Sequence, residues 1–153
     1  MKARQIWSGI LGGLAGGIPF GMMMAMMGVL PMIGKMVGQP TPVAGFVLHM
    51  GISAVIGASF AILFGRVTVT TGRSALAGMV YGGIWWVLGP LTLMPWMMGM
   101  GLGANLNLVA ARDALPSLMG HLVYGVLLGL VEGILARRTQ VHKPVIKPVP
   151  VRL

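Results

Sequence analysis

Four long apolar segments constrain this chain more than any other feature of its sequence. They cover residues 6–33, 42–65, 75–98 and 116–136, and each reaches the roughly 20 residues that a helix needs to cross about 30 Å of hydrocarbon. Strands with open edges cannot satisfy their backbone hydrogen bonds in lipid, and the segments lack the period-two alternation of strands. We therefore predict an all-α integral membrane protein with four transmembrane helices.

Charged residues are too few to cover a surface that faces water. They make up 8% of the 153 residues, whereas soluble domains carry about 25%. A net charge of +9 could suggest nucleic acid, but the basic residues stand in the short segments between the apolar ones, which is the membrane pattern. We expect the lipid bilayer as a partner and no nucleic acid. The absence of cysteine excludes disulfides and thiolate metal sites.

The basic residues also predict how the chain is oriented in the membrane. Nine of the 11 Lys and Arg belong to the N-terminus, the middle loop or the C-terminal segment, and only Lys35 and Arg112 fall on the other side. Because cytoplasmic loops carry the excess of Lys and Arg, both termini are expected in the cytoplasm. Residues 1–136 then form the transmembrane domain, and residues 137–153 form a basic, proline-rich cytoplasmic tail that we expect to be extended.

The two halves of the chain resemble each other and predict an internal repeat. The sequence Leu-Ala-Gly occurs at 14–16 in the first apolar segment and again at 76–78 in the third. His49 and His121, in the second and fourth segments, each precede a glycine by eight residues. Each half is a helical hairpin with the same orientation, so we expect two parallel half-repeats related by an axis along the membrane normal.

Glycines at four-residue spacing indicate how the predicted helices pack. They are Gly9, Gly13, Gly17, Gly21, Gly125, Gly129 and Gly133. Small residues at this spacing let helix backbones approach closely in lipid. We predict tight packing within the bundle or against a second copy of the chain. In the long loop before the fourth segment, residues 105–112 are expected to form a short helix on the outer surface.

Three stretches resemble a family of small four-helix bacterial membrane proteins. They are GGLAGGIPFGMMMAMMGVLPMIG (12–34), YGGIWWVLGPLTLMP (81–95) and LMGHLVYGVLLGLVEG (118–133). The likeness extends over almost the whole chain. It implies a four-helix topology and a bacterial source, and hence a location in the inner membrane, but it carries over no active site.

His49 and His121 are the main candidates for cofactor binding. At 1.5 Å per residue they lie about 10 Å and about 8 Å into their helices, where an ionisable side chain is a candidate functional residue. Two histidines from non-adjacent helices of a bundle are the usual axial ligands of b-type haem. Gly45 and Gly125, each four residues from a histidine, would leave space for the ring. The alternatives are one pigment per histidine, or hydrogen bonds between helices.

Methionine is abundant, with 15 residues, and many of them fall near the outer ends of the predicted helices. This outer set comprises Met32, Met36, Met50, Met94, Met97, Met98, Met100 and Met119. Thioethers and imidazoles are the ligands that Cu(I) prefers, so Met50, Met97, Met98 and Met119 are candidate metal ligands. Methionine is also a flexible apolar filler that packs well beside glycine. Both interpretations stay open.

Catalytic chemistry is not evident in the sequence. Asp113, Ser117 and His121 are spaced four apart, but in a hydrolase triad the histidine must lie between the other two residues. Glu132 falls near the inner end of the fourth segment, and we expect it to reach the membrane interface or to pair with a base there. We therefore expect no enzymatic activity.

A small membrane subunit or assembly factor of a larger or homo-oligomeric complex is the function that the sequence favours. Its partners would be other membrane subunits, or a second copy that associates through the glycine faces. The first alternative is a protein that binds b-type haem or a related tetrapyrrole through His49 and His121. The second is a Cu(I)-handling or small-solute transporter. Trp85 and Trp86, near mid-membrane, would contact a flat pigment or pack against glycine.

Overall fold

The computed structural model describes residues 3–65 and 70–141, which form helices joined by turns. Four helical stretches are long and apolar enough to cross a membrane: Ala3–Met26, Pro42–Phe64, Thr71–Met97 and Leu115–Leu135. The described residues contain no strand. The prediction of an all-α chain with four helices capable of crossing a membrane is confirmed.

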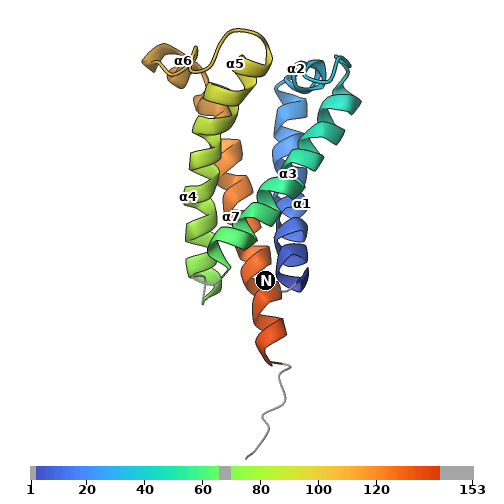
Figure 1. Cartoon of the computed structure of the whole chain (residues 1–153), viewed down its shortest axis with the longest axis vertical. Coiled ribbons are helices and arrows are strands. Elements are labelled where there is room, and N and C mark those ends of the chain that lie inside the picture. Colours follow the sequence, from blue (N-terminus) through green and yellow to red (C-terminus); the bar gives the residue numbers. More distant parts are fainter. Residues whose placement is uncertain (1–2, 66–69, 142–153) are drawn as a thin grey trace, which may run out of the picture.

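The helices form two hairpins that follow each other along the chain (Figure 1). The first contains α1 (Ala3–Met26), α2 (Leu30–Lys35) and α3 (Pro42–Phe64). The second contains α4 (Thr71–Leu88), the π-helix η1 (Gly89–Leu93), α5 (Met94–Met97), α6 (Leu108–Asp113) and α7 (Leu115–Val141). α1 packs on α3 in the first hairpin, and α4 packs on α7 in the second.

Individual residues in the turns determine where the helices begin and end. α1 stops before Gly28, which adopts a φ of +68° that other residues rarely take. The predicted first span, residues 6–33, was therefore too long, because the apolar run continues through the turn into α2. α3 begins as expected, with the hydroxyl of Thr41 accepting a 3.2 Å hydrogen bond from the N–H of Ala44. The short helix expected at 105–112 is α6, slightly displaced.

The third span, Thr71–Met97, stays helical although it contains a proline in its interior. Pro90 has no N–H to continue the α-helical ladder, and the chain widens there into the π-helix η1. The hydroxyl of Thr92 donates a 2.9 Å hydrogen bond to the carbonyl oxygen of Val87 and so supplies a partner beside the proline. α7 extends to Val141, so the first residues assigned to the tail are helical, and residues 142–153 lie outside the described residues.

Glycines make the contacts within each hairpin. A Cβ added at Gly13 of α1 would collide with the carbonyl oxygen of Ser53 on α3. A Cβ added at Gly129 of α7 would collide with the carbonyl oxygen of Ser74 on α4. The backbones approach too closely for any larger residue, as the four-residue spacing predicted.

α1 uses a second glycine face to join the two hairpins. A Cβ at Gly12 would lie 2.8 Å from the carbonyl oxygen of Leu128 on α7, and one at Gly16 would lie 2.6 Å from that of Tyr124. α1 therefore packs between α3 and α7. The glycine faces are occupied within the chain, so self-association through them stays a prediction without support from the fold.

α3 and α4 meet through aromatic side chains. The ring of Tyr81 on α4 lies 5.4 Å from that of Phe60 and 5.5 Å from that of Phe64, both on α3. Beyond this contact the two helices diverge toward the end of the bundle that carries α2, α5 and α6 (Figure 1). The divergence separates the hairpins on one side and positions the site described next.

Candidate functional site

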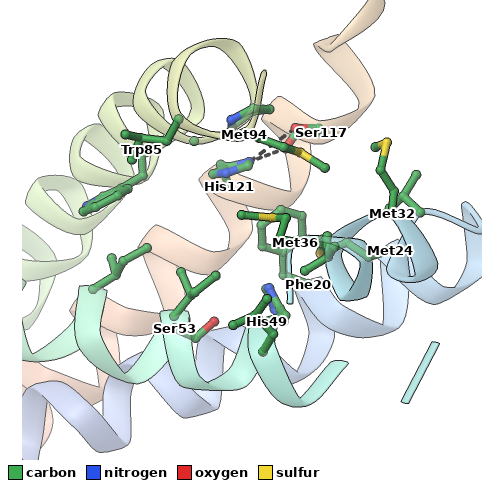
Figure 2. Close-up of a pocket in the computed structure, with 18 of the residues that line it drawn as sticks. Phe20, Met24, Met32, Met36, His49, Ser53, Trp85, Met94, Ser117 and His121 are labelled. Carbon is green, nitrogen blue, oxygen red and sulfur yellow. Dashed lines mark hydrogen bonds between the residues drawn. The ribbon is translucent and has the colours of Figure 1, made fainter. Parts of the chain in front are cut away.

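An apolar cavity of about 500 Å³ lies between the two hairpins (Figure 2). α1, α2 and α3 supply one side of it, and α4, η1, α5 and α7 supply the other. Aliphatic, aromatic and methionine side chains dominate the lining, and among them stand the polar residues His49, Ser53, Ser117, His121 and Tyr124. A volume of this size, with few polar groups in an apolar lining, is typical of sites for small organic molecules.

The two candidate histidines both line this cavity, but their rings are fixed differently. In His121 the Nδ1–H donates a 2.7 Å hydrogen bond to the carbonyl oxygen of Ser117, so the lone pair lies on Nε2. A Cβ at Gly89, in η1, would lie 3.8 Å from this Nε2. In His49 the Nε2–H donates a 2.9 Å hydrogen bond to the carbonyl oxygen of Gly17, so the lone pair lies on Nδ1. Each imidazole thus keeps one nitrogen that can accept a proton or bind a metal.

Phe20 contacts both imidazoles. Its ring lies edge-on to His49 at 5.2 Å and to His121 at 4.7 Å between centroids, and Figure 2 shows it between the two histidines. A single haem iron bound by both residues needs ring nitrogens roughly 4 Å apart, because metal–nitrogen bonds are about 2 Å long. Phe20 would have to leave its position before one iron could bind both histidines.

Gly45 and Gly125 do not leave space for a ring. A Cβ at Gly45 would collide with the carbonyl oxygen of Leu30, and one at Gly125 with that of Gly78. These glycines join helix backbones, so the interpretation that they flank a tetrapyrrole is wrong. The distance of each glycine from its histidine along the helix did not reveal that the glycine faces a neighbouring helix.

Methionines from both hairpins line the cavity. They are Met24, Met27, Met32, Met36, Met94 and Met97. Of the four candidate copper ligands, only Met97 is among them. Met50 packs beside Gly17, Met98 and Met119 are partly exposed, and none of these three lines the cavity. Among the described residues, no group of three His, Cys, Asp or Glu could hold a metal ion.

Trp85 and Trp86 have different environments. The indole N–H of Trp86 donates a 3.0 Å hydrogen bond to the carbonyl oxygen of Ala114, which ties α4 to the start of α7. Trp85 lines the cavity, and its buried Nε1 has no hydrogen-bond partner in the described part of the chain. A buried N–H without a partner costs roughly 1–3 kcal/mol.

Glu132 is buried away from the cavity, with an exposed fraction of 0%. This burial contradicts the expectation that its side chain reaches the membrane interface. Pairing with Arg137 or Arg138 stays a prediction, because the side chains of these two residues lie outside the description. The Oε2 of Glu132 accepts a 3.1 Å hydrogen bond from the hydroxyl of Ser74 on α4, and its Oε1 has no partner among the described residues. Because α4 and α7 pack closely through their glycines, the side chain of Glu132 lies inside the bundle.

No protein-family model, curated protein or solved structure matches this chain. Fold and site alone therefore define its class. It is a multi-pass helical bundle with four helices capable of crossing a membrane, and it contains an apolar cavity of ligand size where its two hairpins diverge.

Proposed function

We propose that this chain is a non-enzymatic membrane protein that binds a small, mostly apolar molecule between its two hairpins. The cavity carries the proposal, because about 500 Å³ of apolar space with a few convergent polar groups suits a cofactor or lipid-like molecule. Ligand binding was the first alternative to the role that the sequence favoured, a small subunit or assembly factor of a larger or homo-oligomeric complex, and the two roles are compatible.

A tetrapyrrole is the ligand class that the polar groups favour. Histidines that bind metals commonly donate their other ring N–H to a carbonyl or carboxylate, as His121 does to Ser117. A haem bound by both histidines would require Phe20 to move, because its ring contacts both imidazoles. We therefore favour one histidine per tetrapyrrole.

A pair of tryptophan substitutions on α3 tests the proposal. Ile52 lines the cavity, whereas Val55 on the same helix is 69% exposed and does not line it. Ile52→Trp should fill the cavity and weaken ligand binding about tenfold or more, or about 1.4 kcal/mol. Val55→Trp should leave binding unchanged. Mass spectrometry of solvent extracts and the absorption spectrum of the purified protein identify and quantify the ligand. Equal occupancy in both variants would contradict the proposal.

Copper handling is the second candidate, and the cavity methionines favour it. Six thioethers and two imidazoles surround one space, and these are the ligands that Cu(I) prefers. The set differs from the one predicted, since it shares only Met97 with it. Elemental analysis of the purified protein distinguishes copper from an organic ligand.

We further propose two parallel half-repeats in a bacterial inner membrane, with both termini cytoplasmic. The orientation is supported by the basic residues, of which only Lys35 and Arg112 lie on the opposite side. The repeat is supported by equivalent contacts. In its register Gly13 corresponds to Ala75, and Gly57 to Gly129. Cβ positions at Gly13 and Gly129 lie 3.0 Å and 2.9 Å from the Cα atoms of Gly57 and Ala75, respectively.

A further inference from the structure

We propose that Glu132 and Ser74 form a proton-binding site inside the membrane-spanning part of the bundle. Both side chains have an exposed fraction of 0%. Glu132 lies within the apolar stretch Leu115–Leu135, and an ionisable side chain at such a place is a functional candidate. The site is separate from the cavity, so the inference holds whether or not the cavity binds a ligand.

The surroundings of Glu132 favour a neutral carboxylic acid. Burial of an ionised carboxylate without a partner charge is strongly unfavourable, and the hydroxyl of Ser74 offers only one neutral hydrogen bond. Arg4 on α1 and Arg73 on α4 are exposed, and among the described residues neither forms an ion pair with Glu132. Arg137 and Arg138 follow on α7, and their side chains lie outside the description. A bound proton removes the charge that this site cannot compensate.

The tyrosines and histidines of the packing helices do not offer a partner either. Tyr81 on α4 pairs with Ser59, and Tyr124 on α7 donates to the carbonyl oxygen of Ser53. His121 on α7 donates to Ser117, in the cavity. Glu132 therefore keeps its proton without help from another titratable group in the described part of the chain.

Glycine contacts close the site around its proton. A Cβ at Gly129 would collide with the backbone of Ser74, and one at Gly133 would lie 2.9 Å from the Cβ of Ser74. Ser74 is thus held between two turns of α7, beside Glu132. Water does not reach the carboxyl group while α1 and α4 remain packed on α7. Release of the proton is therefore coupled to opening of these helix contacts.

Infrared spectroscopy tests the site directly, because Asp113 and Glu132 are the only two acidic residues of the chain. A protonated carboxyl group has a C=O stretching band that lies apart from the amide bands and shifts in D₂O. We expect this band in the wild-type protein at pH 7, where an exposed glutamate is ionised. Glu132→Gln should abolish the band, and Asp113→Asn should retain it. Ser74→Ala should move it to higher frequency, because the hydrogen bond is lost.

The variant Asp113→Asn keeps the test informative even if Glu132→Gln does not fold. In Asp113→Asn the only other carboxyl group is the C-terminus, which is ionised above about pH 5, so the band then belongs to Glu132. Absence of the band from wild type and Asp113→Asn at pH 7, where exposed carboxyl groups are ionised, would overturn the proposal. A carboxylate signal at Glu132 that responds to added sodium would also overturn it, in favour of a metal-cation site.

Discussion

Tyr81 and Tyr124, the only two tyrosines of the sequence, both join α3 to the second hairpin. The hydroxyl of Tyr124 donates a buried 2.8 Å hydrogen bond to the carbonyl oxygen of Ser53, and that of Tyr81 lies 2.7 Å from the hydroxyl of Ser59. Hydrogen bonds between helices in membranes stabilise by about 0.6 kcal/mol on average and by up to about 1.7 kcal/mol. The tyrosines thus add polar links on the side where the cavity separates the hairpins.

Phenylalanine substitutions measure these links. Tyr124→Phe should lower the free energy of unfolding by about 1 kcal/mol, because a buried bond is lost. Tyr81→Phe should cost less, since the hydroxyl of Ser59 also donates a 2.8 Å bond to the carbonyl oxygen of Ile56 and keeps that partner. Denaturant titration in mild detergent, followed by circular dichroism, provides the values. A larger loss for Tyr81→Phe than for Tyr124→Phe would contradict this assignment.

Individual residues of the site were only partly predictable from the sequence. His49 and His121 were identified from their place inside apolar helices, and both line the cavity. Phe20, which contacts both histidines, could not be identified in this way, because its side chain has no polar atom. Glu132 could have been found, because it lies seven residues after Gly125 on the face that also carries Gly129. Its charge led instead to the expectation of an interfacial position.

At the scale of elements, the helix contacts depend on the absence of side chains. Hydropathy and glycine spacing predicted the spans and the packing faces, because both properties are local. The end of α1 was not predictable from hydropathy, since the turn at Gly28 is as apolar as the helix before it. The divergence of α3 and α4 was not predictable either. It arises from packing between hairpins, which no single segment encodes.

A leucine at Gly129 tests the contact between α4 and α7. The new side chain would collide with the backbone of Ser74, whereas a Cβ at Gly51 on α3 meets nothing within 4 Å. Gly129→Leu should lower stability by about 3 kcal/mol or more, because backbone atoms cannot move aside as side chains do in ordinary overpacking of 1–3 kcal/mol. Gly51→Leu is the control and should resemble wild type. Thermal unfolding and size-exclusion chromatography in detergent measure both. Unchanged stability in Gly129→Leu would exclude this packing.

For the whole molecule, α1 and α7 form the central contact, with α3 outside α1 and α4 outside α7. The cavity occupies the side where the two outer helices diverge (Figures 1 and 2). α2, α5 and α6 lie at one end of this arrangement, opposite the N-terminal end of α1 (Figure 1). In the proposed orientation the cavity therefore lies in the outer half of the membrane.

Single cysteines test this orientation cleanly, because the chain has none of its own. A cysteine at Leu108, which is 90% exposed in α6, should react with an impermeant thiol reagent added to the periplasmic side. A cysteine at Thr139, near the end of α7, should react only after the membrane is permeabilised. The reason is the excess of basic residues beside the termini. Labelling of Thr139→Cys in intact cells would reverse the topology.

The central contact between α1 and α7 has a consequence for biosynthesis. It joins the first and last membrane-spanning helices of the chain, so it cannot form until the ribosome has finished α7. Ser117, His121 and Tyr124, which line one wall of the cavity, arrive with that last helix. The first hairpin can close through its own glycines while translation continues, but the cavity does not yet exist. The complete site is therefore available to a ligand only after α7 has been made.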